Sequence, residues 1–179
     1  HSIALPELRA LKKKYSDFTL VHFDAHYDTG DAAWGEKYHH GTWVRRAVEE
    51  GLVKGSKIFQ LGIRQPLTSA GDIEYAKEKG IRVLDIEAFQ DAAKKKAFFS
   101  EIRKSAGKGP VFISFDIDAV DPAFAPGTGT PVVGGLTSLQ ALQRLRSLKG
   151  LQIVGADLVE VSPPFDHAEL TSLLGAAVV

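Results

Sequence analysis

The amino-acid sequence predicts an α/β fold of three layers, in which helices cover both faces of a central, mainly parallel sheet. Five short apolar runs of the kind that forms buried strands alternate with segments of helical pattern. No repeat or low-complexity linker divides the 179 residues. We therefore expect a single α/β domain over residues 1–179.

The five predicted strands share an apolar interior, which is typical of strands buried on both faces. They are Thr19–Asp24, Lys57–Gly62, Ile81–Ile86, Val111–Asp116 and Gln152–Asp157. Because neighbouring parallel strands need crossover connections, we expect those connections to be right-handed.

Helical patterns precede, separate and follow these strands. They lie at Leu5–Lys14, Thr42–Glu50, Asp72–Lys79, Lys96–Ser105, Ser138–Leu148 and Ala168–Val178. Thr137 or Ser138 can cap the helix that follows, and Gly150 lies just past its end. The segment Asp121–Thr137 is too rich in Pro and Gly for an element interior, so it predicts a long ordered loop.

The composition argues against several classes of function. Lys and Arg number 22, as do Asp and Glu, so the chain lacks the basic excess of a nucleic-acid-binding protein. No apolar run approaches the length of about 18 residues expected of a membrane span. The absence of Cys excludes disulfides, thiolate zinc sites and cysteine nucleophiles. We expect neither a nucleic-acid nor a membrane partner.

Three of the five predicted strands end in an aspartate: Asp24, Asp116 and Asp157. In open parallel sheets, ligands bind beyond the carboxyl ends of the strands. One such aspartate alone is more typical of a turn or a helix cap than of a ligand site. Three of them at corresponding positions predict a site at this edge of the sheet.

Two acidic clusters make this prediction more specific. Asp24, His26 and Asp28 are spaced by two residues, which places the side chains of extended backbone on one face. Asp116 and Asp118 repeat that spacing after the fourth strand. So many carboxylates at one edge repel one another unless cations neutralise them. Carboxylate and imidazole ligands suit Mn²⁺, Fe²⁺ or Zn²⁺, and the carboxylate majority favours Mn²⁺.

Bridging carboxylates would allow such a site to hold two metal ions. A binuclear centre lowers the pKa of a shared water and orients the resulting hydroxide for attack on an electrophilic carbon. This chemistry needs no protein nucleophile, and the sequence contains no Gly-x-Ser-x-Gly motif.

Several strings of sequence resemble the signatures of the ureohydrolase family, which comprises arginases and agmatinases. They are HFDAHYD at 22–28, SFDIDAVDP at 114–122, EVSPP at 160–164 and the loop at 125–135. The resemblance covers essentially the whole chain and is nearest to agmatinases. It implies an arginase-like fold, two Mn²⁺ ions per active site and a cytoplasmic hydrolase of guanidino compounds. It also implies a homo-oligomer, a trimer or a hexamer.

By this resemblance, six side chains are expected to hold the metals: His1, Asp24, His26, Asp28, Asp116 and Asp118. Asp24 and Asp116 would bridge the two ions. His1 and Asp28 would complete one shell, and His26 and Asp118 the other. The family's first motif, Gly-Gly-Asp-His-Ser, ends in the two residues with which this sequence starts. We therefore expect a partial chain, the C-terminal two thirds or so of the family's domain.

Two further residues are expected to act on the substrate. Glu160 leaves the last strand, and a carboxylate can accept two parallel hydrogen bonds from a guanidinium, as the family's matching Glu does. His40 directly precedes Gly41, as the family's mobile histidine precedes its Gly. That pattern selects His40 over His39 as the group that protonates the leaving amine.

Other polar and aromatic residues near these motifs receive structural interpretations. His22, inside an apolar strand, is interpreted as a core histidine with satisfied hydrogen bonds. Asp157 is expected to orient a ligand imidazole, and Asp121 to shape a turn or support the ligands. Trp34 and Trp43 either line the pocket or pack beneath it.

The part of the substrate attached to the guanidinium, here called its tail, is inferred from the loop Thr29–Tyr38. This loop lacks the Asn and Ser residues with which arginases contact their substrate. Its carboxylates Asp31 and Glu36 would bind an amine and disfavour a carboxylate. We therefore expect agmatine, hydrolysed to putrescine and urea. Guanidinobutyrate or another guanidino acid is the second candidate. A non-catalytic interaction protein that retains the metal site is a weaker alternative.

Overall fold

The computed structural model describes residues 1–65 and 70–179 and contains the predicted parallel sheet. Within these residues the strands run in the order β3-β2-β1-β4-β5, and every neighbouring pair is parallel. The strands are β1 (Thr19–Phe23), β2 (Ile58–Ile63), β3 (Arg82–Asp85), β4 (Pro110–Asp116) and β5 (Gln152–Val159). The two central strands of the site, β1 and β4, are neighbours.

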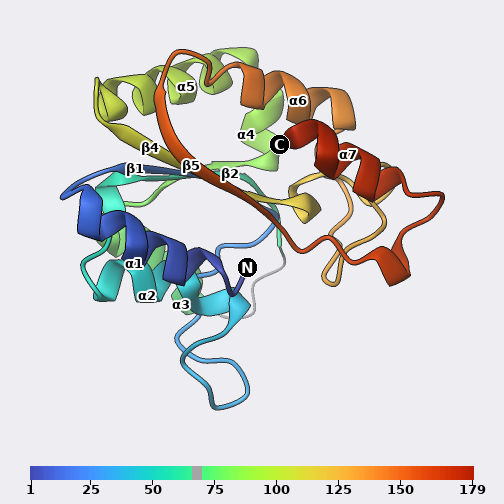
Figure 1. Ribbon diagram of the computed structural model, residues 1–179. Helices are drawn as coiled ribbons and strands as arrows, with labels where there is room; N and C mark the ends of the chain where they lie inside the picture. Colours follow the sequence, from blue (N-terminus) through green and yellow to red (C-terminus); the bar gives the residue numbers. More distant parts are fainter. Residues whose placement is uncertain (66–69) are drawn as a thin grey trace.

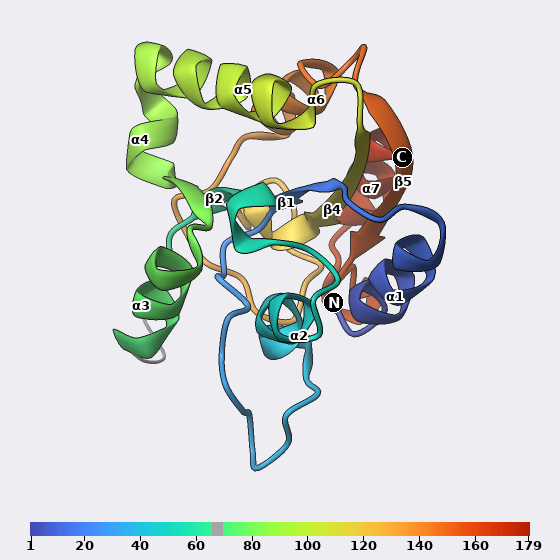
Figure 2. The same cartoon turned by 90° about the vertical axis from the view of Figure 1, so that its left-hand side faces the viewer.

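Helices cover both faces of the sheet, which confirms the three-layer α/β/α fold (Figures 1 and 2). One face carries α1 (Ala4–Lys14), α2 (Trp43–Glu49) and α3 (Ala70–Lys79). The other face carries α4 (Ile86–Gln90), α5 (Ala92–Ala106), α6 (Ser138–Arg146) and α7 (Leu170–Val178). No helix of the described residues is long and apolar enough to cross a membrane.

Alternation along the strands divides the buried apolar residues into two cores. Leu20, Ile58 and Phe112 pack with the helices α1 and α2. Val21 and Phe23 point the opposite way, into the core beneath α4 to α7. Side chains alternate across a strand, so even-numbered residues of β1 face the α1 and α2 layer. His22 is one of them.

Several predicted boundaries were wrong, for local reasons. The strand expected at 81–86 ends at Asp85, whose carboxylate accepts a hydrogen bond from Ala88 N at 2.7 Å and caps the unpredicted helix α4. Asp91 likewise caps α5, which begins at Ala92 rather than at 96. The last helix begins at 170 because the two residues before it have positive φ angles.

The strand β5 continues to Val159, so Asp157 lies inside the strand and not at its end. The interpretation of three strands ending in aspartate therefore holds only at Asp24 and Asp116. Asp157 instead pairs in register with Ser114 of β4. Asp157 therefore lies level with a residue two positions before Asp116, the last residue of β4.

The loop at 121–137 is ordered by two charged side chains. The Asp121 carboxylate accepts hydrogen bonds from Gly134 N at 2.6 Å and Gly135 N at 2.9 Å. The Arg64 guanidinium donates to the carbonyls of Asp118, at 2.7 Å, and of Val132. Burial lowers the pKa of Arg64, and nearby carboxylates oppose this. These bonds hold the loop against the carboxyl end of β4.

Candidate metal centre

The two acidic clusters meet because their strands are neighbours. Asp24 follows β1 and Asp116 ends β4, and the residues before them, Phe23 and Phe115, are aligned partners. The Asp116 carboxylate accepts a hydrogen bond from Asp118 N at 2.9 Å, which starts a single 3₁₀ turn. That turn brings Asp118 back to the end of β1. All three carboxylates are buried.

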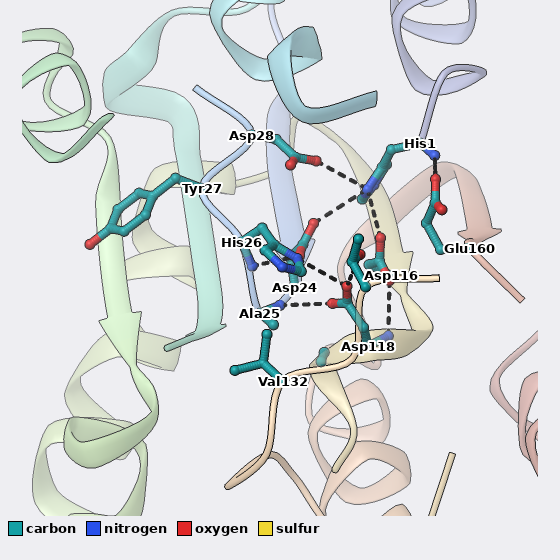
Figure 3. A network of polar contacts seen from close by, with 12 residues as sticks. His1, Asp24, Ala25, His26, Tyr27, Asp28, Asp116, Asp118, Val132 and Glu160 are labelled. Atoms are coloured by element: carbon teal, nitrogen blue, oxygen red, sulfur yellow. Dashed lines mark hydrogen bonds and ion pairs between the residues drawn. The ribbon is translucent and has the colours of Figure 1, made fainter. Parts of the chain in front are cut away.

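The first group of candidate ligands surrounds the His1 imidazole (Figure 3). Its Nδ1 atom lies 3.0 Å from Asp116 Oδ2, 3.2 Å from Asp28 Oδ2 and 3.3 Å from Asp24 Oδ2. Ligand atoms bound to one metal at about 2.1 Å lie about 3 Å apart. These spacings therefore fit a shared cation.

The hydrogen bonds of His1 show where its proton lies. Ser114 Oγ donates to Asp157 Oδ1 at 2.7 Å, so it accepts from His1 Nε2, also at 2.7 Å. In the neutral ring, Nδ1 then carries no proton. This buried atom faces three carboxylates. Burial lowers the pKa of His1, but hydrogen bonds with Asp116, Asp24 and Asp28 outweigh it and raise that pKa well above its ordinary value. Without metal, a proton is therefore held between Nδ1 and the carboxylates, at the position that a bound cation would take.

The second group shares Asp24 with the first. His26 Nδ1 lies 3.2 Å from Asp24 Oδ1 and 3.0 Å from Asp118 Oδ2. Asp24 therefore turns one oxygen toward each group. Two groups of side chains are spaced to hold an ion: His1, His22, Asp24 and Asp28 form the first, and Asp24, His26 and Asp118 form the second. The structure thus brings together all six predicted ligands, whose metal binding stays a prediction.

Burial and mutual repulsion shift the pKa values of this cluster. Burial raises the pKa of Asp116 well above its ordinary value, and the charges of Asp24 and Asp118 raise it further. Burial lowers the pKa of His26, but hydrogen bonds with Asp118 and Asp24 outweigh it and raise that pKa to about 11. Without metal, the cluster therefore retains protons that bound cations would replace.

Glu160 and His40 lie together at the rim of the centre. Glu160 Oε1 is 4.0 Å from His40 Nδ1, and the Glu160 side chain lies beside the backbone nitrogen of His1 (Figure 3). Glu160 has a φ of 64°, a left-handed conformation that is uncommon outside glycine and clusters at functional sites. His39 instead accepts a hydrogen bond from Gly41 N at 3.1 Å and caps a short turn.

A pocket of about 400 Å³ opens beside the candidate ligands His26, Asp28 and Asp116. The histidines His39 and His40 also line it. The 29–38 loop forms one wall, where Trp34 is 90% exposed. A bound molecule would therefore reach the metal centre past this loop.

A scan against protein-family models matches the description "Arginase family" over residues 1–179, which is the whole sequence. The chain belongs to the arginase family. This agrees with the resemblance of its motifs and with the fold.

Curated relatives of this arginase-family chain carry several names. A guanidinobutyrase of Pseudomonas aeruginosa is 49% identical over 98% of the chain, and the match covers 55% of that protein. A mitochondrial agmatinase of Gallus gallus is also 49% identical, over 98% of the chain and 52% of that protein. The chain thus spans about half the length of the curated relatives it matches.

Solved structures share the fold. Proclavaminate amidino hydrolase from Streptomyces clavuligerus matches with a TM-score of 0.89 and 41% identity, over 99% of this chain and 58% of that one. Arginase from Bacillus caldovelox matches equally well, with a TM-score of 0.89, over 99% of this chain and 64% of that one. At 24% identity, the second match bears on the fold alone.

The two carboxylates expected to bind the substrate tail do not line the pocket of this arginase-family chain. Asp31 Oδ1 accepts a hydrogen bond from Arg46 at 2.9 Å and lies 3.6 Å from Arg45, and its side chain is 72% exposed. Glu36 is exposed in the same loop. Besides the candidate ligands Asp28 and Asp116, the pocket is lined by one further acidic residue among those described, Asp72 of α3, which the sequence motifs did not indicate.

Trp43 supports the ligands rather than lining the pocket. Its Nε1 donates to Asp28 Oδ2 at 2.6 Å, and its ring stacks on His1 with centroids 4.9 Å apart. Ser114 and His22 contact ligands in the same way, from positions two residues before Asp116 and Asp24. That spacing of two, which marks one face of a strand, is a signal that could have identified both.

Proposed function

We propose that this chain forms part of a hydrolase that uses two Mn²⁺ ions to release urea from a guanidino compound. The buried Nδ1 of His1, which lies 3.0–3.3 Å from oxygens of three carboxylates, carries this proposal. The sharing of Asp24 with the group around His26 supports a second ion. The carboxylate majority among the ligands favours manganese.

The ligands would divide as the sequence motifs imply. His1 and Asp28 would complete one shell, His26 and Asp118 the other, and Asp24 and Asp116 would be shared between the two ions. When bound, two divalent ions acidify a water between them for attack on the guanidinium carbon at neutral pH.

Glu160 is proposed to bind the guanidinium by accepting hydrogen bonds from its N–H groups, because Glu160 directly follows β5 and its carboxylate lies beside His1. His40 is proposed to give a proton to the leaving amine. Its Nδ1 lies 4.0 Å from Glu160 Oε1, which supports a role for His40 beside a guanidinium held by that carboxylate.

For the tail of the substrate we propose the amine of agmatine, which would yield putrescine and urea. Asp72 lines the pocket, and none of the described residues that line it is a Lys or an Arg. A positively charged tail is favoured by such a lining, whereas a carboxylate tail finds no cationic partner there. Asp31 and Glu36 remain predicted contacts.

Guanidinobutyrate is the second candidate, on two observations. Arg45 and Arg46 flank Asp31 and offset the charge that would repel an acidic tail. A relative named guanidinobutyrase is 49% identical over 98% of this chain. A cytoplasmic location and a homo-oligomeric assembly are proposed from the resemblance as well.

Urea release by the full-length protein, loaded with Mn²⁺, tests the reaction and the tail together. We expect a higher kcat/KM for agmatine than for arginine or guanidinobutyrate. A preference for guanidinobutyrate would overturn the choice of tail but leave the reaction intact. A protein that binds two Mn²⁺ ions and releases no urea from any of the three would favour the non-catalytic alternative.

A further inference from the structure

One row of buried polar residues crosses the sheet beneath the candidate metal centre. The strand register aligns Gln60 of β2 with His22 of β1, His22 with Ser114 of β4, and Ser114 with Asp157 of β5. All four are buried. Side chains aligned across neighbouring strands point to the same face of a sheet. We call these four residues the polar row.

The polar row crosses the sheet two residues before the candidate ligands that follow β1 and end β4. His22 and Ser114 stand two residues before Asp24 and Asp116, so each lies on the same face as the ligand that follows. One level further down, the face is apolar, with Leu20 aligned to both Ile58 and Phe112. Buried polar groups cost free energy unless they are hydrogen-bonded. A single polar level therefore indicates a role tied to the ligands above it.

One half of the row reaches His1. Asp157 accepts from Ser114, and Ser114 accepts from His1 Nε2, each at 2.7 Å. The proton of the neutral imidazole is thereby kept on Nε2, and Nδ1 is left to face the carboxylates.

The other half reaches Asp24 through a chain of forced donors. Gln60 Nε2 donates to the carbonyl of Tyr27 at 2.7 Å, and a carbonyl can only accept, which fixes the amide orientation. The same amide nitrogen then donates to His22 Nδ1 at 3.1 Å. His22 therefore carries its proton on Nε2 and donates it to Asp24 Oδ2 at 2.7 Å.

We propose that the polar row is a positioning layer, in which Gln60 and His22 orient Asp24 and keep both of its oxygens directed at the two ion positions. His22 is then a positioning residue, and not only the core histidine that its place in an apolar strand predicts. This inference rests on the proposed metal-dependent function. It assigns His22 and Gln60 no contact with the substrate.

The first test compares Mn²⁺ affinity in variants of the full-length protein. Loss of a partner behind a metal ligand typically costs about 10- to 100-fold in metal affinity, and we expect a loss of that size for His22→Leu. His22→Gln keeps an N–H near the position of Nε2, so its affinity is expected within several-fold of the parent. Affinity in His22→Leu within about twofold of the parent, in a folded protein, overturns the proposal.

Thr19→Val is the matched control. Thr19 is buried on the same strand, and its hydroxyl has no hydrogen-bond partner among the described residues. Removal of this hydroxyl takes away a buried polar atom of β1 without touching the polar row. We expect Thr19→Val to bind Mn²⁺ with the affinity of the parent protein. A loss as large as that of His22→Leu would mean that any change in β1 weakens the centre, and would contradict a specific role of His22.

A second readout needs neither metal nor activity. Nitrogen NMR of the metal-free protein is expected to show His22 protonated on Nε2 alone. In Gln60→Glu, the new carboxylate accepts a proton from Nδ1, so both ring nitrogens should become protonated and Mn²⁺ affinity should fall. A proton on Nδ1 in the parent overturns the hydrogen-bond chain. A parent that binds no Mn²⁺ overturns the proposed function and, with it, the role in orienting Asp24.

Discussion

At the scale of single residues, the carboxylates of the centre differ in what they contact. Asp116 is buried against His1, with Asp118 N donating to its other oxygen. Glu160 follows β5 and lies 4.0 Å from His40 at the rim. The first environment suits a metal ligand, and the second suits a group that holds substrate.

Asp116→Asn and Glu160→Gln should therefore fail in different ways. Asparagine replaces a charged oxygen with an N–H donor, so we expect at least about a 100-fold loss of Mn²⁺ affinity and of urea release. Glu160→Gln should keep its metals and lose roughly 10- to 100-fold in kcat/KM, since one charge-assisted contact is weakened. Metal analysis of both purified variants checks this division, which equal metal loss would contradict.

The neighbouring histidines provide a second contrast at this scale. His40→Asn should lower kcat by at least about 100-fold, because it removes the proposed proton donor, and should leave metal content unchanged. His39→Asn is the matched control, since His39 caps a turn through Gly41 N. Steady-state kinetics of both variants is the measurement. A larger loss of kcat in His39→Asn would reassign the role.

At the scale of elements, the 121–137 loop is held closest at Gly135. A Cβ added there would lie 2.5 Å from Arg64 Nη2 and 2.6 Å from Asp121 N, so even an alanine at this position would force the Arg64 side chain and the Asp121 backbone to move. We expect Gly135→Ala to lower the free energy of unfolding by about 1–3 kcal/mol. Gly129→Ala, in the same loop with open space around it, should change it by less than about 0.5 kcal/mol. Denaturant unfolding of both variants measures the difference.

The elements also show how far sequence reasoning extends. Apolar runs located the five strands, and motif spacing placed Asp24 and Asp116 at strand ends, because both signals are local. The alignment of Gln60 with His22 depends on which strands become neighbours, which no local pattern contains. The pairing of Asp31 with Arg46 was missed for the same reason, since it joins a loop to a helix.

At the scale of the whole molecule, the centre should link stability to pH and to metal. In the folded, metal-free chain the pKa of His26 rises from 6.5 to about 11, because hydrogen bonds to Asp118 and Asp24 outweigh burial. Protonated His26 thus stabilises the fold fully below about pH 6.5, and this contribution is lost as the pH rises toward 11. A bound metal ion requires the unprotonated imidazole of His26, so metal-dependent stabilisation instead increases as the pH rises.

We therefore expect the Tm of metal-free protein to fall between pH 7 and pH 10, and the fall to be smaller in His26→Asn. With Mn²⁺ present, the Tm gain from metal should increase over the same range, as protons no longer compete for the ligands. Thermal unfolding with chelator and with Mn²⁺ measures both slopes. Parallel slopes in the two conditions would show that His26 does not exchange a proton for a metal ion.

Anomalous X-ray scattering from the full-length protein crystallised with Mn²⁺ tests most directly the proposed pair of ions with Asp24 and Asp116 shared between them. We expect two manganese peaks, one beside His1 and one beside His26, each roughly 2.0–2.3 Å from a different oxygen of Asp24. A single peak, or peaks that do not share Asp24, would contradict the binuclear centre.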